Sequence, residues 1–288
     1  MKNVEWPFLG SEALAAGAIP ERALRSLYEA VYPGVYVPWG VELTASQRAR
    51  AAWLWSRRRA VVTGHSAAAL LGAKWVDPLA PAELAYDNRH APKLIAVHTD
   101  TLLDGEVMEV DGVAVTTAAR TAFDIGRRAP RLLALQKLDA LANASDVKVL
   151  DVEAVTAQHR GARGIRRLRQ ILPLVDGGAE SPRETWTRLA LIDAGFPTPR
   201  TQIPVFGLGG CVVARIDMGW DEWRVGVEYD GAQHWTDPLQ RTRDIDRWSE
   251  VADSRWTIIR VGSDMLRYRQ GTLLYRVGAA LSAAGWRP

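Results

Sequence analysis

The chain has 288 residues, enough for two or three domains, and its 48% hydrophobic and 24% charged residues are ordinary for a folded protein. This composition excludes an intrinsically disordered chain. A formal net charge of +3 and a pI near 9.1 favour contact with an acidic polymer without requiring it. The single cysteine, Cys211, excludes internal disulfides and multi-cysteine zinc sites, and its apolar neighbours predict a small buried side chain.

The chain begins MKNVEWPFLG, which lacks the apolar core of a signal peptide. No later run approaches the roughly 20 apolar residues of a membrane-spanning helix. We therefore expect a cytoplasmic protein with no membrane partner.

The first 40 residues predict two short helices followed by a β-hairpin. Ser11 is the expected N-cap of the first helix and Gly17 its end, the second helix begins at Pro20, and a β-run with a Pro–Gly break follows. This order is that of a small winged helix-turn-helix, in which Arg22 and Arg25 of the second helix would contact DNA phosphates or base edges. Because short helix pairs are common, a purely structural role stays open.

Two later segments, RAVVTGHSAAALLGA and DGVAVTTAARTAFDIGRR, resemble the two signature segments of AbiEi-type abortive-infection antitoxins. The resemblance covers residues 10–128 and implies a winged helix over residues 1–40, followed by a small α/β domain over residues 41–128. It also implies DNA as a partner, with a cognate toxin or a second copy of the chain as further candidates.

The histidines of this region read as structural residues. His65 opens a helix directly after the strand AVVT, so we expect it to make hydrogen bonds at the strand end and not to bind a metal. His90 and His98 have no partner at metal-ligand spacing. The Thr–Thr–Ala–Ala–Arg run at residues 116–120 predicts a capped helix start.

Residues 129–176 predict a helical basic linker made of two helices, RLLALQKLDALANAS and DVEAVTAQHRGARGIRRLRQILPLV. The second helix carries five arginines: Arg160, Arg163, Arg166, Arg167 and Arg169. A charge run of this kind is usually a solvated helix face. It also suits a surface that follows a DNA backbone, for which Arg163, Arg166 and Arg167 are the candidates.

Carboxylates recur in the C-terminal part of the chain, where apolar strands are expected. Asp217 closes one β-patterned run, Glu228 and Asp230 close the next, and DEWR between them reads as a hairpin tip. Buried carboxylates repel one another unless a proton or a cation compensates, and Mg²⁺ prefers such oxygen ligands. The pattern predicts phosphodiester hydrolysis, and the alternative is that all three carboxylates are solvated strand ends.

The blocks ESPRETWTRLALIDAGFPTPRTQ, RIDMGW, VGVEYDGAQHW and RTRDIDRWSEVADSRWTIIRV resemble an uncharacterised actinobacterial family related to very-short-patch-repair endonucleases, a branch of the PD-(D/E)XK nuclease superfamily. The resemblance covers residues 177–288. It implies a restriction-endonuclease-like mixed sheet flanked by helices.

This resemblance implies a role for each acidic residue of the site. Asp217 and Glu228 would bind Mg²⁺ or Mn²⁺, Glu180 would be the acid on the helix, and His234 would transfer protons. Asp230 stands where the superfamily has a lysine. A carboxylate cannot polarise the attacking water as an ammonium would.

Neighbouring residues are accessory candidates. Gln233 follows the acidic strands, and Arg243 with Asp244 forms either a phosphate clamp or an ordinary ion pair on a helix surface. Trp220 and Trp235 are close enough in sequence to the acidic strands to stack on a nucleobase.

Capping signals define the helices of this part. Ser181 is a good N-cap, Pro182 suits the first helical position, and Glu184 falls at capping-box spacing. Glu184 therefore reads as structural, which leaves Glu180 as the functional acid. SRWTIIRV predicts a buried strand, and Ser263 is the expected cap of a final helix.

Together these patterns predict a multidomain α/β protein that cleaves DNA with the help of Mg²⁺. The alternative is a non-catalytic DNA-binding regulator of antitoxin type, in which the nuclease fold is only a scaffold. RNA as the substrate stays open, because no residue reads a 2′-hydroxyl recognisably.

Overall fold

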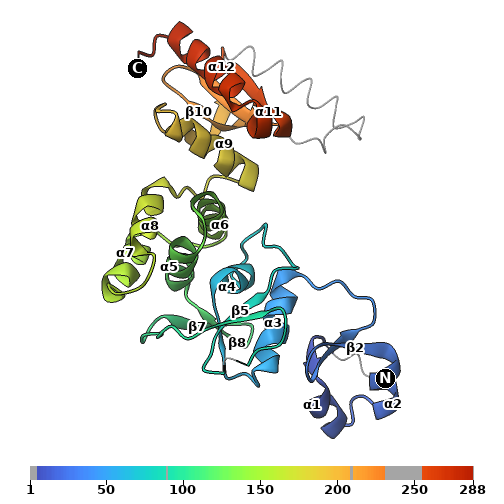
Figure 1. Cartoon of the computed structure of the whole chain (residues 1–288). Coiled ribbons are helices and arrows are strands. Elements are labelled where there is room, and N and C mark those ends of the chain that lie inside the picture. Colours follow the sequence, from blue (N-terminus) through green and yellow to red (C-terminus); the bar gives the residue numbers. More distant parts are fainter. Residues whose placement is uncertain (1–4, 89, 208–209, 231–254, 288) are drawn as a thin grey trace. The chain divides into compact units, whose positions relative to one another are not determined.

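The computed structural model describes residues 5–88, 90–207, 210–230 and 255–287 (Figure 1). The chain divides into two compact units, Met1–Val175 and Asp176–Pro288, which we call the N-terminal unit and the C-terminal unit. Each unit combines helices with β-sheet, so the expected mixed α/β class is confirmed. The winged helix and the restriction-endonuclease-like fold stay interpretations.

The first part of the N-terminal unit is a three-stranded antiparallel sheet with two short helices. Its elements are β1 (Phe8–Leu9), α1 (Gly10–Ala15), α2 (Glu21–Leu27), β2 (Tyr28–Tyr32) and β3 (Val35–Pro38), and the strand order is β1-β3-β2. Gly34, with φ +80°, forms the tight turn between β2 and β3. The predicted cap at Ser11 is wrong, because α1 already begins at Gly10 and its N-cap is Leu9.

The second part of the N-terminal unit is a five-stranded mixed sheet. Its strands are β4 (Val61–Val62), β5 (Ala82–Ala85), β6 (Ile95–His98), β7 (Val107–Val110) and β8 (Val113–Thr116), in the order β6-β5-β4-β8-β7. β5 is parallel to β6 and β4 to β8, whereas the other pairs are antiparallel. The helices α3 (Ala45–Trp55) and α4 (Gly64–Leu70) share one core with this sheet. They contribute buried alanines such as Ala52 and Ala67, whose small side chains suit close approach to Val62 and Leu84.

Five further helical segments complete the N-terminal unit: α5 (Ala118–Arg128), α6 (Arg131–Ala144), α7 (Val149–Gln158), α8 (Ile165–Ile171) and the 3₁₀ turn η1 (Leu172–Leu174). The prediction of one long helix through the arginine run is wrong. The helix is interrupted before Gly164, and α8 begins directly after it. Gly164 has φ +91° and lies so close to the backbone carbonyl of Arg127 that any side chain there would collide with that carbonyl.

The C-terminal unit is a four-stranded sheet with helices before and after it. Its elements are α9 (Pro182–Asp193), β9 (Arg200–Phe206), β10 (Val212–Trp220), β11 (Val225–Tyr229), β12 (Thr257–Val261), α11 (Ser263–Tyr268) and α12 (Gln270–Ala283), and the strand order is β12-β11-β10-β9. β9, β10 and β11 are antiparallel, and β12 is parallel to β11. Buried apolar residues of α11 and α12, including Leu266 and Val277, form one core with Val227 and Val261 of the sheet.

Two predictions about single residues of this unit are wrong. Ser263 does not cap one final helix, because it is the first residue of α11, and Arg269 separates α11 from α12. Cys211 is exposed in the turn before β10 and is not buried in a strand. Within the described residues, no helix is both long and apolar enough to cross a membrane.

Candidate functional site

Asp217 lies inside strand β10, which continues to Trp220, so the prediction that Asp217 closes its strand is wrong. The antiparallel register pairs Met218 with Val227, and the next positions along the two strands are Asp217 and Glu228. The Asp217 carboxylate accepts a hydrogen bond of 2.7 Å from the backbone N–H of Tyr229. Glu228 is only 8% exposed. Two neighbouring strands therefore do bring carboxylates to one place in the sheet.

A third carboxylate, Glu184, comes to Asp217 from helix α9. Glu184 is 8% exposed, and burial raises its pKa to about 7, with the negative charge of Asp217 adding to the rise. Glu184 also accepts a hydrogen bond of 2.8 Å from the backbone N–H of Glu180. A carboxyl group with this pKa exchanges its proton near neutral pH, which is the range that general acid–base chemistry needs.

Glu180, the residue that the resemblance makes the helix acid, is exposed and precedes the helix. The predicted cap is confirmed, because the Ser181 side chain accepts a hydrogen bond of 3.2 Å from the backbone N–H of Glu184. Glu184 thus carries both a capping contact and the electrostatic contact with Asp217. Sequence spacing indicated the first role and gave no signal for the second.

The remaining predicted residues of this site fall into two groups. Asp230 directly follows β11, and its backbone N–H donates a hydrogen bond of 2.9 Å to Val261. The residues Gln233, His234, Trp235, Arg243 and Asp244 lie outside the described residues. Trp220 does not stack on a nucleobase as predicted, because it is 5% exposed and its indole N–H donates a hydrogen bond of 2.8 Å to Pro197.

The described part of the site offers a divalent cation few ligands. No group of three or more His, Cys, Asp or Glu side chains within the described ranges is arranged to hold a metal ion. Asp217 and Glu228, opposite each other on β10 and β11, match the one or two carboxylates that Mg²⁺ typically takes from a protein, with waters completing its shell.

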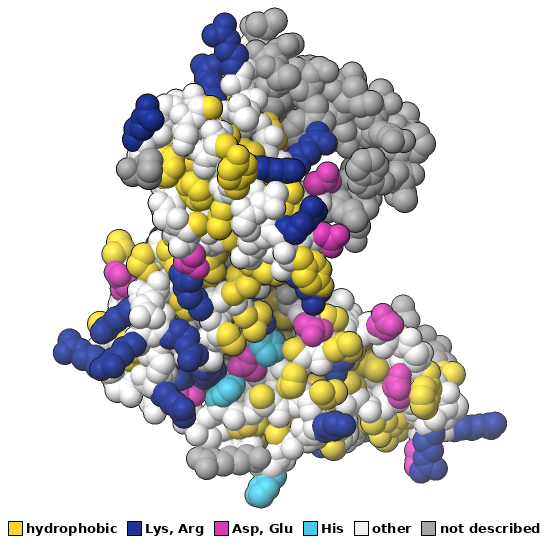
Figure 2. Space-filling model, turned by 45° about the horizontal axis from the view of Figure 1, so that its top comes forward, with side chains coloured by type: hydrophobic (Ala, Val, Ile, Leu, Met, Phe, Trp, Pro, Cys, Tyr) yellow, Lys and Arg dark blue, Asp and Glu magenta, His cyan; other side chains and the backbone are white. Residues whose placement is uncertain are grey.

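The predicted DNA-binding arginines differ in what they contact. Arg163 and Arg166 are exposed, on either side of the start of α8. Arg167 donates hydrogen bonds of 3.2 Å to the carbonyls of Arg128 and Ala129, at the C-terminal end of α5, and so caps that helix. On the face that Figure 2 shows, Lys and Arg side chains gather over the part of the N-terminal unit that contains α7 and α8.

In α2, both predicted arginines are exposed. Arg25 forms an ion pair of 2.5 Å with Glu21, one helical turn earlier, in which both side chains are more than two-thirds exposed. An exposed pair of this kind contributes little to stability and exchanges easily for a phosphate contact.

A buried ionic network that sequence analysis did not anticipate lies in the N-terminal unit. At its centre is Arg120, which is 1% exposed and contacts the carboxylates of Asp124 and Glu106 and the carbonyl of Thr101. His159, the C-cap of α7, contacts the other oxygen of Glu106 at 2.6 Å. The network therefore joins α5 and α7 to the loop before β7. Thr117 is the N-cap of α5, as predicted.

A second set of charges continues from this network toward the sheet edge. Asp124 contacts Arg127, and the adjacent arginine, Arg128, forms an ion pair of 2.7 Å with Asp100 and a longer one of 3.5 Å with Glu83. The first of these contacts lies within α5, whereas the two contacts of Arg128 join α5 to the loop after β6 and to strand β5. The charges are therefore neutralised pairwise and not left to solvent.

The Glu83 carboxylate is held between two histidines. His65 contacts one oxygen, and His98 contacts the other at 2.7 Å. Burial alone would raise the pKa of Glu83, but the hydrogen bonds from the two histidines hold it well below its usual range. The prediction that His65 makes hydrogen bonds at the strand end is confirmed, since it also contacts the carbonyl of Pro81 at 2.9 Å.

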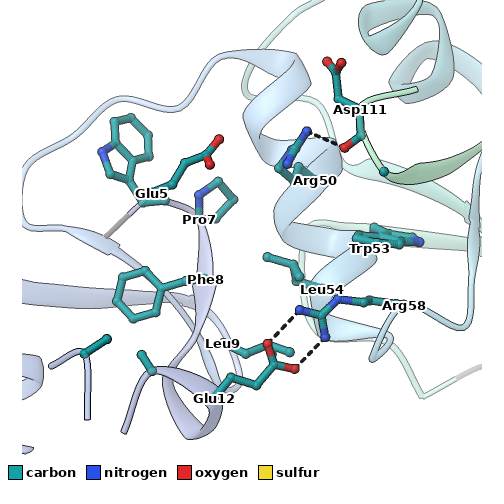
Figure 3. Close-up of a pocket in the computed structure, with 14 residues that line it drawn as sticks. Glu5, Pro7, Phe8, Leu9, Glu12, Arg50, Trp53, Leu54, Arg58 and Asp111 are labelled. Carbon is teal, nitrogen blue, oxygen red and sulfur yellow. Dashed lines mark hydrogen bonds and ion pairs between the residues drawn. The ribbon is translucent and has the colours of Figure 1, made fainter. Parts of the chain in front are cut away.

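A cavity of about 450 Å³ lies between the two parts of the N-terminal unit (Figure 3). Phe8 and Leu9 line it from one side and Leu54 of α3 from the other. Arg58 reaches across it and donates hydrogen bonds of 2.5 and 2.7 Å to the two oxygens of Glu12. This bidentate pair links residues 46 positions apart, which sequence spacing alone cannot suggest.

Comparison with known proteins gives one family match. Residues 60–174 match the family described as AbiEi antitoxin C-terminal domain. Two relatives from Mycobacterium tuberculosis, strains CDC 1551 / Oshkosh and ATCC 25618 / H37Rv, are each 35% identical over 178 residues, and both are described only as uncharacterized proteins. The aligned part is 62% of this chain and 65% of each relative, so the chain spans slightly less than two thirds of their length. No solved structure matches.

The family match contains the network around Arg120 and the Glu83 cluster, whereas the carboxylates of Glu184 and Asp217 lie beyond it. The relation to very-short-patch-repair endonucleases is not shown and stays a prediction. The chain carries an AbiEi antitoxin-like domain over residues 60–174.

Proposed function

We propose that this chain is a DNA-binding regulator of the antitoxin type, which binds DNA and a cognate toxin. The observation that carries the proposal is the match of residues 60–174 to the AbiEi antitoxin C-terminal domain. The matched segment includes the whole sheet β6-β5-β4-β8-β7 and the helices from α4 to α8, but not α3, so the likeness extends over a folded part and not a short motif.

Exposed arginines support the DNA-binding part of this proposal. Arg163 and Arg166 stand on the surface near the start of α8, and Arg22 is exposed on α2. Arginines bind phosphates without regard to base sequence, whereas reading a sequence requires contacts with base edges. We assign phosphate binding to the α8 arginines and base reading to α2.

The proposal is tested by DNA binding and DNA cleavage on one preparation of the full chain. Duplex DNA from upstream of its own gene is the probe for binding, and a supercoiled plasmid with Mg²⁺ or Mn²⁺ is the probe for cleavage. We expect salt-dependent binding of the duplex and an intact plasmid. Plasmid nicking by the parent but not by the Asp217→Ala variant would overturn the non-catalytic reading.

A second candidate function, metal-dependent cleavage of DNA, is favoured by one observation in the C-terminal unit. Asp217 raises the pKa of the buried Glu184 and lies opposite Glu228 in the sheet, and carboxyl groups with a pKa near 7 cluster at functional sites. In this reading Asp217 and Glu228 would hold Mg²⁺ or Mn²⁺, and the metal ion would supply a water of lowered pKa as the nucleophile. Glu184 then accepts a proton at its carboxylate oxygen.

A further inference from the structure

The last 33 described residues carry a strong excess of positive charge. Residues 255–287 contain six arginines and a single acidic residue, Asp264. All six arginines are exposed: Arg255, Arg260, Arg267, Arg269, Arg276 and Arg287. This excess lies in the C-terminal unit, outside the segment that matches the antitoxin family.

Two tyrosines of the same segment have side chains that are largely exposed to solvent. Tyr268, at the end of α11, is 70% exposed, and Tyr275, on α12, is 77% exposed. The opposite side of α12 packs on the sheet through Leu273, Val277 and Leu281, which are fully buried. The helix is therefore anchored without help from Tyr275, and the exposed rings are not needed to complete the core.

Arginine and tyrosine alternate closely along this surface. The sequence reads Arg–Tyr–Arg at residues 267–269 and Tyr–Arg at residues 275–276. The guanidinium of Arg267 lies 5.3 Å from the centroid of the Tyr268 ring. Such contacts hold the ring in place while most of its surface stays open to solvent.

We propose that this surface, formed by Arg267, Tyr268 and Arg269 at the end of α11 and by Tyr275 and Arg276 of α12, binds single-stranded nucleic acid. The arginines neutralise the phosphate backbone, and the two tyrosine rings stack on unpaired bases. Duplex DNA fits less well, because its bases are already stacked on one another and offer no free face. The inference does not depend on the proposed regulator function, since it rests on residues outside the antitoxin-like domain.

The test measures binding of the full chain to labelled single strands by fluorescence anisotropy. The probes are a 20-nucleotide oligothymidylate, the matching oligouridylate and a 20-base-pair duplex. Replacing both tyrosines, Tyr268→Ala with Tyr275→Ala, should weaken single-strand binding about tenfold or more, since each stacked base contributes at least a factor of about five. The double phenylalanine variant, which keeps both rings, should bind as the parent does.

Three comparisons keep this result specific. The Trp39→Ala variant removes an aromatic residue that is 62% exposed in the N-terminal unit and should leave single-strand binding unchanged. The pair Arg267→Gln with Arg276→Gln should weaken binding and flatten its dependence on salt. If the double alanine variant loses affinity equally for the oligothymidylate and the oligouridylate, the surface contacts the bases and phosphates and does not distinguish the sugar.

Some outcomes would overturn the inference. If the double alanine variant bound both single strands as tightly as the parent, the rings would have no role. A preference for the duplex would likewise reject it. Binding of none of the three probes would reject it in favour of a protein partner. If duplex binding were lost only in variants of the α8 arginines, that result would bear on the proposed regulator function and not on this surface.

Discussion

Glu184 of helix α9 and Asp217 of strand β10 lie close enough inside the C-terminal unit for the charge of Asp217 to raise the pKa of Glu184. Burial first, and then the negative charge of Asp217, raises the pKa of Glu184 to about 7. The folded chain therefore keeps a proton that the unfolded chain loses near its ordinary pKa of 4.5. This contact is the strongest chemical feature of the C-terminal unit.

The first prediction concerns the pH dependence of stability. Because the folded state binds the Glu184 proton more tightly, the free energy of unfolding should fall as pH rises from about 4.5 to about 7 and stay level above that. Glu184→Gln cannot ionise, so it should lack this decline and be more stable than the parent at pH 8 by about 1–3 kcal/mol. Urea unfolding at pH 5 and pH 8 measures both effects. The exposed Glu222→Gln serves as the control, and a decline unchanged in Glu184→Gln would assign it to another group.

The second prediction concerns divalent cations. If Asp217 and Glu228 hold Mn²⁺, the melting temperature should rise with millimolar Mn²⁺, because a ligand bound only by the folded state stabilises it. Asp217→Asn should remove most of this rise. Asp221→Asn, half-exposed beyond the end of β10, should keep it. Identical melting curves of the parent with and without Mn²⁺ would argue against the nuclease candidate.

The third prediction concerns Glu83 and its two histidines. The depressed pKa of Glu83 means that its carboxylate stabilises the fold above its unfolded pKa, and that this contribution is lost as pH falls through the folded pKa. Glu83→Gln should therefore cost about 2–4 kcal/mol at pH 7, and the difference from the parent should shrink below pH 4. Thermal unfolding across this range, with the exposed Glu109→Gln as control, is the measurement.

Gly64 offers an independent check on the same cluster. It has φ +57°, and a side chain on it would collide with the Glu83 carboxylate. Gly64→Ala should therefore destabilise the fold at pH 7, through this collision and through the strain of a side chain at positive φ. An alanine variant as stable as the parent at pH 7 would show that Glu83 moves aside at no cost.

The fourth prediction separates the arginines of α8. Arg163→Ala with Arg166→Ala should weaken duplex binding equally for all sequences and reduce the slope of log affinity against log salt by about 2. Arg167→Ala should instead lower the melting temperature, because it removes hydrogen bonds to the last carbonyls of α5. The exposed pair Lys74→Ala with Lys93→Ala changes the net charge equally and controls for it. Full DNA affinity in the double arginine variant would remove α8 from the interface.

Local signals in the sequence were reliable where one turn of chain determines the structure. The caps at Ser181 and Thr117 depend on the three residues that follow them, and both are confirmed. The strand at residues 257–261 follows from its β-branched run. The caps expected at Ser11 and Ser263 fail because each helix begins earlier than its serine suggests, at a backbone position fixed by the preceding strand.

Local signals of this kind do not predict contacts between residues that are far apart in the sequence. Glu184 reads as a capping residue because its partner Ser181 is three positions away, whereas Asp217 is brought to it only by the folded sheet. The break at Gly164 likewise depends on the closeness of Arg127, which no helical periodicity reveals. The sequence therefore identified Asp217 and Glu228 as candidates, but it did not identify Glu184, whose pKa is raised to about 7.

Helix α5 has neighbours on several sides, and this limits where the chain can be shortened. Gly126 of α5 has no room for a side chain because Leu168 of α8 lies against it, and His159, the C-cap of α7, reaches Glu106 beside Arg120. A fragment ending at Arg128 would keep the sheet but lack these neighbours, so it would expose the face of α5 that Leu138 and Leu168 cover and leave Glu106 without His159. An expression fragment of the antitoxin-like part therefore needs to run through Val175 to remain intact.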